Sequence, residues 1–549
     1  MRPSGRNDIF INADAIEVGA QSFMSFLKKD NKIKILFVTT EEVPFAQVGG
    51  LGEVMFALPR ALRALGHDAR VMIPYYGTIN KNVFHPDYIF KDLSVPTEPD
   101  NGGKGLICSV RMSEKISDSR SPVPTYFLEN QEYYETRANI YGYMDDRVRF
   151  ALFSRGCLEF LNFYRDWTPD IIVTTDWMTG YLPNLLKTDY KDYRNLQNIA
   201  TLFSIHNLSS QGTVRHHQFL QETERDDGHG SLPDFFSERM LYINAMRRGI
   251  IYSDLINTVS PTYAEEITTV EFGEGLDPLL REKRGRLFGV LNGIDYITNN
   301  PETDPYLVKN FSVNSIHCRV ENKIALQKRF GLPQDENIFM LGVVSRLVRQ
   351  KGFELLEPIL TDFIKETNAQ LIVLGTGDTS IMDIFQKFEK DFPSNIRTHF
   401  QFEDTLPHLI YAGCDVLLVP SKFEPSGLIQ MEAMRFGAVP IARKTGGLAD
   451  TIDDYAPETD KGDGFLFTEF KPNALLVAMT RAFVNWRYKE RWRELQKRAM
   501  IKDFSWNRSA REYIALFKRA IKLHAQDISN YKEKNNGVHN YDTHLGLKN

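Results

Sequence analysis

The chain contains two series of short, β-branched apolar segments that alternate with loops and amphipathic helical patterns. In the first series, residues 32–39 (KIKILFVT) have the composition of a buried parallel strand, and the glycine loop 48–52 follows. Apolar residues at helical spacing from Glu53 predict a helix that ends near Gly66, and residues 69–73 predict the next strand. This order of elements begins a doubly wound sheet.

A second series of the same kind begins near Asn337, after the loop-rich stretch 295–313. Its predicted elements are strands at 338–344, 370–374, 416–419 and 438–442 and helices at 353–366 and from about Gly427. We therefore predict an α/β protein with two Rossmann-like, doubly wound domains that face a central cleft. Ligands of such sheets bind beyond the carboxyl ends of the strands.

Composition and charge exclude several classes of protein. With 66 Lys and Arg against 71 Asp and Glu, the formal charge is −5, which argues against nucleic acid as a partner. No apolar run approaches the roughly 18 residues of a membrane span, so no membrane partner is expected. Four widely spaced cysteines fit a reducing compartment. Residues 1–30 lack the order of a signal peptide, which favours a cytoplasmic protein; a plastid protein would need them as a targeting segment.

Several catalytic motifs are absent from the sequence. No G-x-G-x-x-G follows a predicted strand, and no G-x-x-x-x-G-K-[ST] occurs, which argues against nicotinamide dehydrogenases and P-loop enzymes. There is no H-E-x-x-H, no Asp-x-Asp and no G-x-S-x-G nucleophile elbow. We therefore expect neither a metal nor another cofactor.

Polar residues follow two predicted strands of the first series. Asp176 comes directly after residues 171–175, and His206 and Asn207 come directly after 200–205. These are ligand-facing positions. Alone, however, each has an ordinary structural explanation, as does Asn292, which can be part of a simple turn.

Two glycine loops have related sequences. Gly49 and Gly50 in the first loop have no side chains and lie between a predicted strand and a predicted helix, so backbone N–H groups there can approach an anion. The second loop, Lys444-Thr445-Gly446-Gly447, adds a cation and a hydroxyl group. A tight turn between strand and helix explains the glycines of each loop as well as anion binding does.

Charged residues cluster in two segments of the second series. Arg346 follows a predicted strand and Lys351 stands at the predicted start of a helix, so a guanidinium, an ammonium and a helix N-terminus would converge there. Such a site suits a leaving diphosphate; the alternative is a solvated basic loop. Glu424 and Glu432 stand eight positions apart, where they can accept hydrogen bonds from sugar and ribose hydroxyls; the alternative is a helix-terminal charge and an exposed face.

In this order, the segments resemble the bacterial and plant-type starch and glycogen synthases over roughly residues 33–522. The resemblance extends to stretches such as 61–70 (ALRALGHDAR), 259–263 (VSPTY), 291–296 (LNGIDY) and 504–506 (FSW). It implies a retaining glucosyltransferase of GT-B fold that transfers glucose from ADP-glucose to an α-1,4-glucan.

The resemblance also implies roles for individual residues. Arg346 and Lys351 would neutralise the diphosphate, with Glu424 and His206 near the transferred glucose and Asp176 on the acceptor side. The remaining positions assigned to donor binding are Gln47, Gly49, Gly50, Asn207, Asn292, Gly427, Leu428, Glu432, Lys444, Thr445, Gly446 and Gly447.

The implied domains are an N-terminal extension (1–30), an acceptor-side domain (31–300), a nucleotide-sugar domain (301–503), a helix that crosses back (504–525) and a polar tail (526–549). No sequence feature indicates an oligomeric state.

Some residues depart from the family pattern. Gln47 stands where a lysine is usual, Met178 where many members have histidine, and Glu432 where many bacterial members have an aromatic residue. These departures keep two alternatives open: a GT-B enzyme with another nucleotide sugar or acceptor, and a catalytically degenerate paralogue that binds glucan or regulates a true synthase. They also predict that Gln47→Lys raises kcat/KM.

Overall fold

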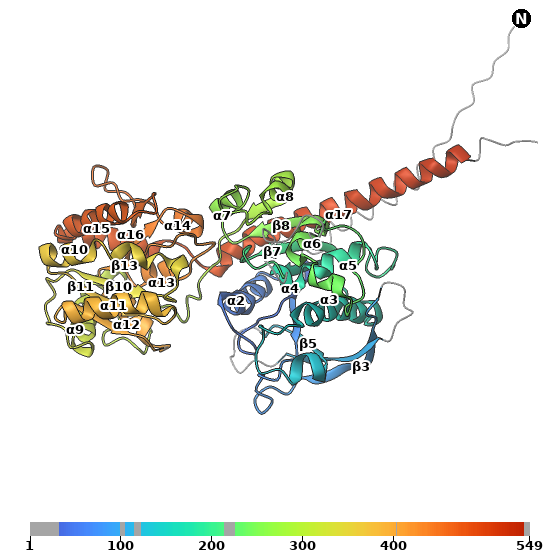
Figure 1. The fold of residues 1–549 in the computed structure, drawn as a ribbon, viewed down its shortest axis with the longest axis horizontal. Helices are drawn as coiled ribbons and strands as arrows, with labels where there is room; N and C mark the ends of the chain where they lie inside the picture. The colour runs from blue at the N-terminus through green and yellow to red at the C-terminus, as the bar shows by residue number, and fades with distance from the viewer. Residues whose placement is uncertain (1–31, 99–104, 115–121, 213–225, 402, 543–549) are drawn as a thin grey trace, which may run out of the picture.

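The computed structural model describes residues 32–98, 105–114, 122–212, 226–401 and 403–542. It contains two α/β domains that lie side by side, with the long C-terminal helix α17 running back along the first of them (Figure 1). The predicted fold class is therefore confirmed for these residues. The predicted N-terminal extension, residues 1–30, lies outside them.

The first domain is built on a nine-stranded sheet in the order β3-β4-β5-β2-β1-β6-β7-β8-β9. Neighbouring strands are parallel from β5 to β9, and β3 and β4 form an antiparallel edge. The strands are β1 (Lys34–Val38), β2 (Asp68–Pro74), β3 (Asp87–Val95), β4 (Leu106–Ser113), β5 (Thr125–Glu129), β6 (Ile171–Thr175), β7 (Ala200–Ile205), β8 (Leu255–Thr258) and β9 (Leu287–Gly289).

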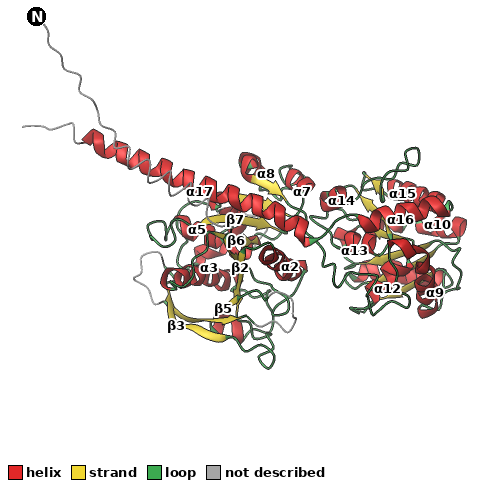
Figure 2. Cartoon of the chain, turned by 180° about the vertical axis from the view of Figure 1, so that it is seen from behind, coloured by secondary structure: helices red, strands yellow, loops and turns green. Residues whose placement is uncertain are grey.

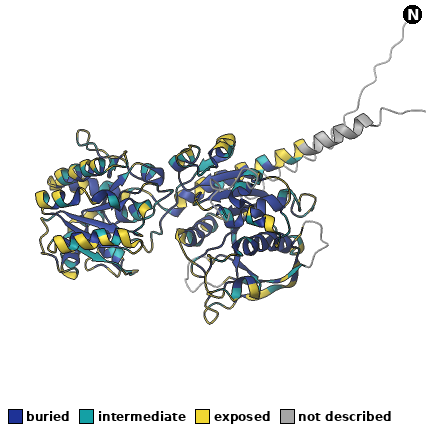
Figure 3. Ribbon diagram, in the orientation of Figure 1, coloured by how far each residue is buried: buried dark blue, intermediate teal, exposed yellow. Residues whose placement is uncertain are grey.

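Helices cover this sheet and bury its central strands. They are α2 (Gly50–Ala64), α3 (Asp146–Phe163), α4 (Asp176–Thr179), α5 (Tyr181–Lys187), α6 (Ala245–Tyr252), α7 (Pro261–Glu266) and α8 (Asp277–Glu282). Every residue of β6 and β7 is buried, as Figure 3 shows for the centre of the domain. This burial explains their continuous apolar sequences, because a parallel strand covered on both faces has no solvent-facing positions.

The second domain is a six-stranded parallel sheet in the order β12-β11-β10-β13-β14-β15. Its strands are β10 (Met340–Val344), β11 (Gln370–Leu374), β12 (Ile396–His399), β13 (Val416–Val419), β14 (Val439–Arg443) and β15 (Phe465–Phe467). Its helices are α9 (Arg319–Arg329), α10 (Leu360–Thr367), α11 (Thr379–Asp391), α12 (Leu406–Gly413), α13 (Ile429–Arg435), α14 (Gly446–Thr451), α15 (Pro472–Trp486) and α16 (Lys489–Ile501). None of the described helices combines the length and apolarity needed to cross a bilayer.

The predicted helix at 353–366 is wrong in its first half. A 3-10 turn, Phe353–Leu356, comes first, and α10 starts only at Leu360. Pro358 lies between the two and has no N–H to continue a helical ladder. Gly352, with φ of +73°, separates the turn from the preceding loop.

The chain crosses between the domains twice, and the two crossings are hydrogen-bonded to each other. The backbone N–H of Ile294 donates to the carbonyl of Phe504 at 2.8 Å. The Tyr296 hydroxyl accepts from the N–H of Phe504 at 2.8 Å and donates to the carbonyl of Lys502 at 3.1 Å. These contacts join the two connections into one junction between the domains.

After the second crossing, the N-terminal part of α17 (Trp506–Asp542) packs along the first domain, and the helix then extends beyond it (Figure 2). Phe517 contacts Phe37 of β1 edge-on, and the Asn257 amide donates to the Tyr513 hydroxyl at 3.1 Å. The helix begins two residues after the predicted start of the crossing helix. It also continues through most of the predicted polar tail, to Asp542, and residues 543–549 lie outside the description.

A buried polar cluster fastens α17 to the first domain. His524 lies with Nδ1 3.1 Å from Asp254 and 2.8 Å from the Lys187 ammonium, and with Nε2 2.8 Å from the carbonyl of Gln197. Asp254 also accepts from the N–H and hydroxyl of Thr201. Burial alone would raise the pKa of Asp254, but the hydrogen bond from His524, followed by the charge of Lys187, lowers it to about 2.

We expect His524→Leu to destabilise the first domain by about 1–3 kcal/mol, because it leaves buried polar partners unsatisfied. Differential scanning fluorimetry should show a melting temperature several degrees lower. Gln526→Ala, at an exposed position of the same helix, is the control and should leave it unchanged. Equal melting temperatures for the two variants would contradict the role of the cluster.

Candidate active site

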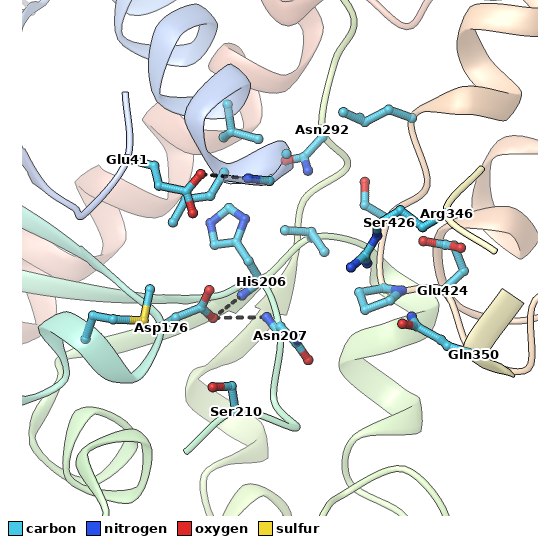
Figure 4. Close-up of a pocket in the computed structure, with 18 of the residues that line it drawn as sticks. Glu41, Asp176, His206, Asn207, Ser210, Asn292, Arg346, Gln350, Glu424 and Ser426 are labelled. Atoms are coloured by element: carbon cyan, nitrogen blue, oxygen red, sulfur yellow. Dashed lines mark hydrogen bonds between the residues drawn. The ribbon is translucent and has the colours of Figure 1, made fainter. Parts of the chain in front are cut away.

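A cavity of about 610 Å³ lies between the two domains, lined by both of them (Figure 4). Loops that follow β1, β6 and β7 approach it from the first domain, and loops that follow β10 and β13 approach it from the second. The predicted site residues that line it are Gly49, Gly50, Asp176, His206, Asn207, Asn292, Arg346, Lys351, Glu424, Gly427 and Leu428.

An ion pair lies in the wall that the second domain contributes. The Lys351 ammonium is 2.6 Å from Oε2 of Glu424, and the Ser421 hydroxyl donates to the same oxygen at 2.9 Å. Glu424 is buried. Since Lys351 holds this carboxylate, part of its charge is already neutralised within the protein.

Arg346 provides a second cation on the same wall. Its guanidinium has no carboxylate partner within the described residues, and Arg346 is exposed. The predicted helix N-terminus beside it is wrong, however: Arg349–Lys351 form a 3-10 turn that ends at Gly352 in the left-handed region. The local positive charge therefore comes from side chains, without a helix dipole.

The first glycine loop is open towards the cavity. A Cβ atom built on Gly49 would meet no atom within 4 Å, and one on Gly50 would meet only Leu428 Cδ1, at 3.9 Å. Protein packing therefore does not require glycine at either position. Glu41 holds the loop, accepting the N–H groups of Val48 and Gly49 at 2.7 and 2.9 Å.

Asp176 supports the loop that carries His206. It has φ of +51°, and its Oδ1 accepts the backbone N–H groups of His206 and Asn207 at 2.7 and 3.0 Å. Burial raises the pKa of Asp176 to about 7, and these two hydrogen bonds oppose the shift. Its assignment to the acceptor side stays a prediction.

His206 is a neutral imidazole at neutral pH, because desolvation lowers its pKa to about 4. Its Nε2 lies 3.0 Å from the Ser204 hydroxyl. Two lining groups, in contrast to His206, are buried without a partner in the described protein: Oδ1 of Asn292 and the hydroxyl of Ser426. Such groups cost free energy unless a ligand or water satisfies them, so they indicate a polar ligand.

The second glycine loop does not line the cavity. A Cβ on Gly446 would lie 2.1 Å from the carbonyl of Glu424, and one on Gly447 would lie 1.9 Å from the carbonyl of Ser426. Thr445 and the N–H of Gly446 both donate to the Glu266 carboxylate of the first domain, at 2.8 and 3.0 Å. The glycines therefore allow α14 to pack closely against the loop that carries Glu424.

Three further predicted donor-binding residues also lie outside the cavity lining. Lys444 is exposed. The Gln47 amide donates to Glu53 at 3.2 Å, and the Tyr411 hydroxyl donates to Glu432 at 3.2 Å. Burial raises the pKa of Glu432 to about 7, and the nearby Glu53 carboxylate adds to this shift. The predicted roles of these residues stay predictions.

Several lining residues were not among the predicted site residues, including Glu41, Tyr141 and Gln350. The Tyr141 hydroxyl donates to Glu41 at 2.8 Å, and the Gln350 amide donates to the carbonyl of Phe423 at 3.2 Å. Glu41 follows the predicted strand 32–39, and this position could have identified it. No local pattern marks Tyr141.

Within the ranges that the structure describes, no group of three or more His, Cys, Asp or Glu side chains is arranged to hold a metal ion. The expectation that no cofactor is needed stays a prediction.

Comparison with known proteins identifies both halves of the chain. Residues 34–282 match the starch synthase catalytic domain, and residues 323–499 match the glycosyl transferases group 1. The chain is 41% identical to a glycogen synthase of Clostridium acetobutylicum over 490 residues, covering 88% of this chain and 99% of that protein. It is 38% identical to a glycogen synthase of Thermotoga maritima over 500 residues, covering 89% and 99%.

Solved structures agree with this assignment. The catalytic domain of starch synthase IV from Arabidopsis thaliana, bound to ADP and acarbose, superposes with a TM-score of 0.75 at 33% identity, over 89% of this chain and 100% of that one. A sucrose-phosphate synthase from Thermosynechococcus elongatus, with a TM-score of 0.53, 18% identity and coverage of 88% and 98%, shares the fold. The chain thus belongs to the glycogen and starch synthase family of glycosyltransferases.

Proposed function

We propose that this chain is an α-1,4-glucan synthase that transfers glucose from ADP-glucose to the non-reducing end of a glucan, with retention of configuration and without a metal. The observation that carries the proposal is the placement of Arg346, Lys351 and Glu424 of one domain and His206 of the other around a single cavity. The Arabidopsis starch synthase IV, solved with ADP and acarbose, supports the choice of donor and acceptor.

Departure of ADP from the donor concentrates negative charge on the diphosphate. Arg346 has no carboxylate partner in the described protein, so its guanidinium is available for this charge. Lys351 lies beside Glu424, and its ammonium can contact both the carboxylate and an arriving phosphate. Charged donors aimed at developing charge are a large source of catalysis in a site that excludes water.

Positive charge develops at the anomeric carbon at the same time. A neutral His206 adds no opposing cation near this centre, which suits a group that contacts the sugar. The buried Glu424 carboxylate supplies negative charge. The unpartnered Asn292 Oδ1 and Ser426 hydroxyl are matched to sugar hydroxyls as acceptor and donor.

The proposed retention rests on how the lining carboxylates are held. Glu41 and Asp176 each accept two backbone N–H groups. Asp146 accepts the N–H of Gly142 at 2.7 Å, and Glu424 pairs with Lys351. Because protein donors hold all four, we assign removal of the acceptor proton to the leaving phosphate, with attack on the same face of the sugar.

The proposal is tested by incubating purified protein and glycogen with radiolabelled ADP-, UDP- or GDP-glucose in the presence of EDTA. We expect incorporation to be fastest from ADP-glucose and unaffected by the chelator. Faster transfer from another nucleotide sugar would overturn the donor assignment. Glucan binding without any incorporation would identify a degenerate paralogue.

Arg346→Gln should lower kcat/KM by about 10²–10³-fold, by analogy with the loss of one oxyanion-hole donor. The matched control is Arg349→Gln, three residues away, exposed and outside the cavity lining, which should leave kcat/KM within about twofold. Steady-state kinetics measure both. Equal values for the two variants would contradict the assignment of Arg346 to the leaving group.

Ionisation of Asp176 should appear in the pH profile. Below a pKa of about 7 the carboxyl is protonated and loses the charge that stabilises the two N–H groups of the His206 loop, so kcat/KM should fall on the acid side. Asp176→Asn keeps an acceptor oxygen but cannot ionise. The ratio of wild-type to variant kcat/KM should therefore rise between about pH 6 and 8. A constant ratio would contradict this account.

A further inference from the structure

A second cavity, of about 180 Å³, lies in the second domain on the opposite edge of its sheet from the catalytic cleft. Asn337 and Asp415 line it just before β10 and β13 begin, whereas the cleft residues follow the carboxyl ends of these strands. Its other walls come from the start of α9, the end of α15 and the first turns of α16.

Positive charge dominates this cavity. Its lining contains the cations Arg319, Lys323, Lys489 and Arg493 but only two carboxylates, Glu336 and Asp415, although the whole chain carries a net charge of −5. Oδ2 of Asp415 is held by the protein, since it accepts the Lys323 ammonium at 2.7 Å and the backbone N–H of Met340 at 2.9 Å.

Two cations of α16 line the cavity, Lys489 and Arg493, and neither has a carboxylate partner within the described residues. Lys489 lies over the Trp486 ring, with its nitrogen 3.0 Å from the ring centroid. Partial burial there lowers the pKa of Lys489 to about 8. Arg493 follows one helical turn later, on the same face.

Backbone groups add to this positive field. Lys489 stands at the first position of α16, whose N-terminus has no side-chain cap, whereas α9 continues directly from the 3-10 helix Val313–Cys318. A cation at this position opposes the helix dipole. An anion in the cavity would be attracted by the dipole of α16 and by the basic side chains.

A buried donor in the wall also lacks a partner. Trp492 is 4% exposed, and its Nε1–H finds no acceptor in the described protein. Its ring packs parallel to Phe465, with centroids 6.1 Å apart, so the indole is held firmly by the core. A buried N–H without an acceptor costs free energy, which a ligand oxygen in contact with it would recover.

We propose that this cavity binds a phosphoryl anion, either inorganic phosphate or a small phosphate monoester, at a site separate from the catalytic cleft. Lys489 and Arg493 supply the charged contacts, and Trp492 supplies a neutral hydrogen bond. A dianion with several acceptor oxygens matches cations and N–H donors that converge from different elements. The cavity volume limits the ligand to a phosphate with a short organic group.

The test uses the full chain labelled with ¹⁵N-tryptophan, titrated with sodium phosphate or glycerol 3-phosphate at constant ionic strength. The five tryptophans give five indole N–H resonances. Trp492→Phe assigns the resonance that reports this cavity, and Trp177→Phe assigns one that reports the catalytic cleft. Binding of phosphate in the cleft is thereby distinguished from binding at the proposed site.

We expect the Trp492 resonance to shift downfield and saturate with either ligand, and the ratio of the two affinities identifies the source of the phosphoryl group. The double variant Lys489→Gln, Arg493→Gln should weaken this binding at least tenfold. Arg491→Gln, exposed on the same helix but outside the cavity lining, should leave it unchanged. A Trp492 resonance that does not move, that moves equally with chloride, or that titrates alike in the double variant overturns the proposal.

Discussion

The arrangement of the cavity depends on how the chain connects the two domains. It passes between them twice, and hydrogen bonds hold the two connections together. Ile294 and Phe504 belong to the two connections and share a backbone hydrogen bond, and Tyr296 bonds to both sides of the second connection. The helix α17 then anchors the returning chain on the first domain. Groups more than 100 residues apart, such as His206 and Arg346, can therefore meet at one cavity.

Most charged side chains that line this cavity bond to other groups of the protein, and a few do not. The carboxylates Glu41, Asp176 and Glu424 are each held by protein donors, and His206 is neutral. Arg346 has no carboxylate partner within the described residues, so its charge is available to a ligand. This division matches a transfer in which the leaving group becomes anionic while the sugar becomes cationic, because a free cation can stabilise the first and a neutral imidazole adds no cation beside the second.

Much of the fold could be predicted because the buried parallel strands are continuous apolar runs, and the segments 370–374 and 416–419 coincide with β11 and β13. The position of Arg346 and Glu424 at the cavity could also be predicted, since each follows such a strand, while their roles stay predictions. Paired glycines, however, occur both in a loop that is open to a ligand and in a loop that packs tightly against backbone. Only the structure shows that Gly49 belongs to the first kind and Gly446 to the second. Tyr141 could not be predicted, because its contact with Glu41 spans 100 residues.

The most direct test of glucosyl transfer in this cleft is ¹H NMR spectroscopy of the protein with ADP-glucose and maltohexaose. We predict that each ADP released is matched by one new α-1,4-linked anomeric signal, with maltoheptaose as the first product. Release of ADP with free glucose, or a new β-anomeric signal, would contradict retaining transfer to a glucan.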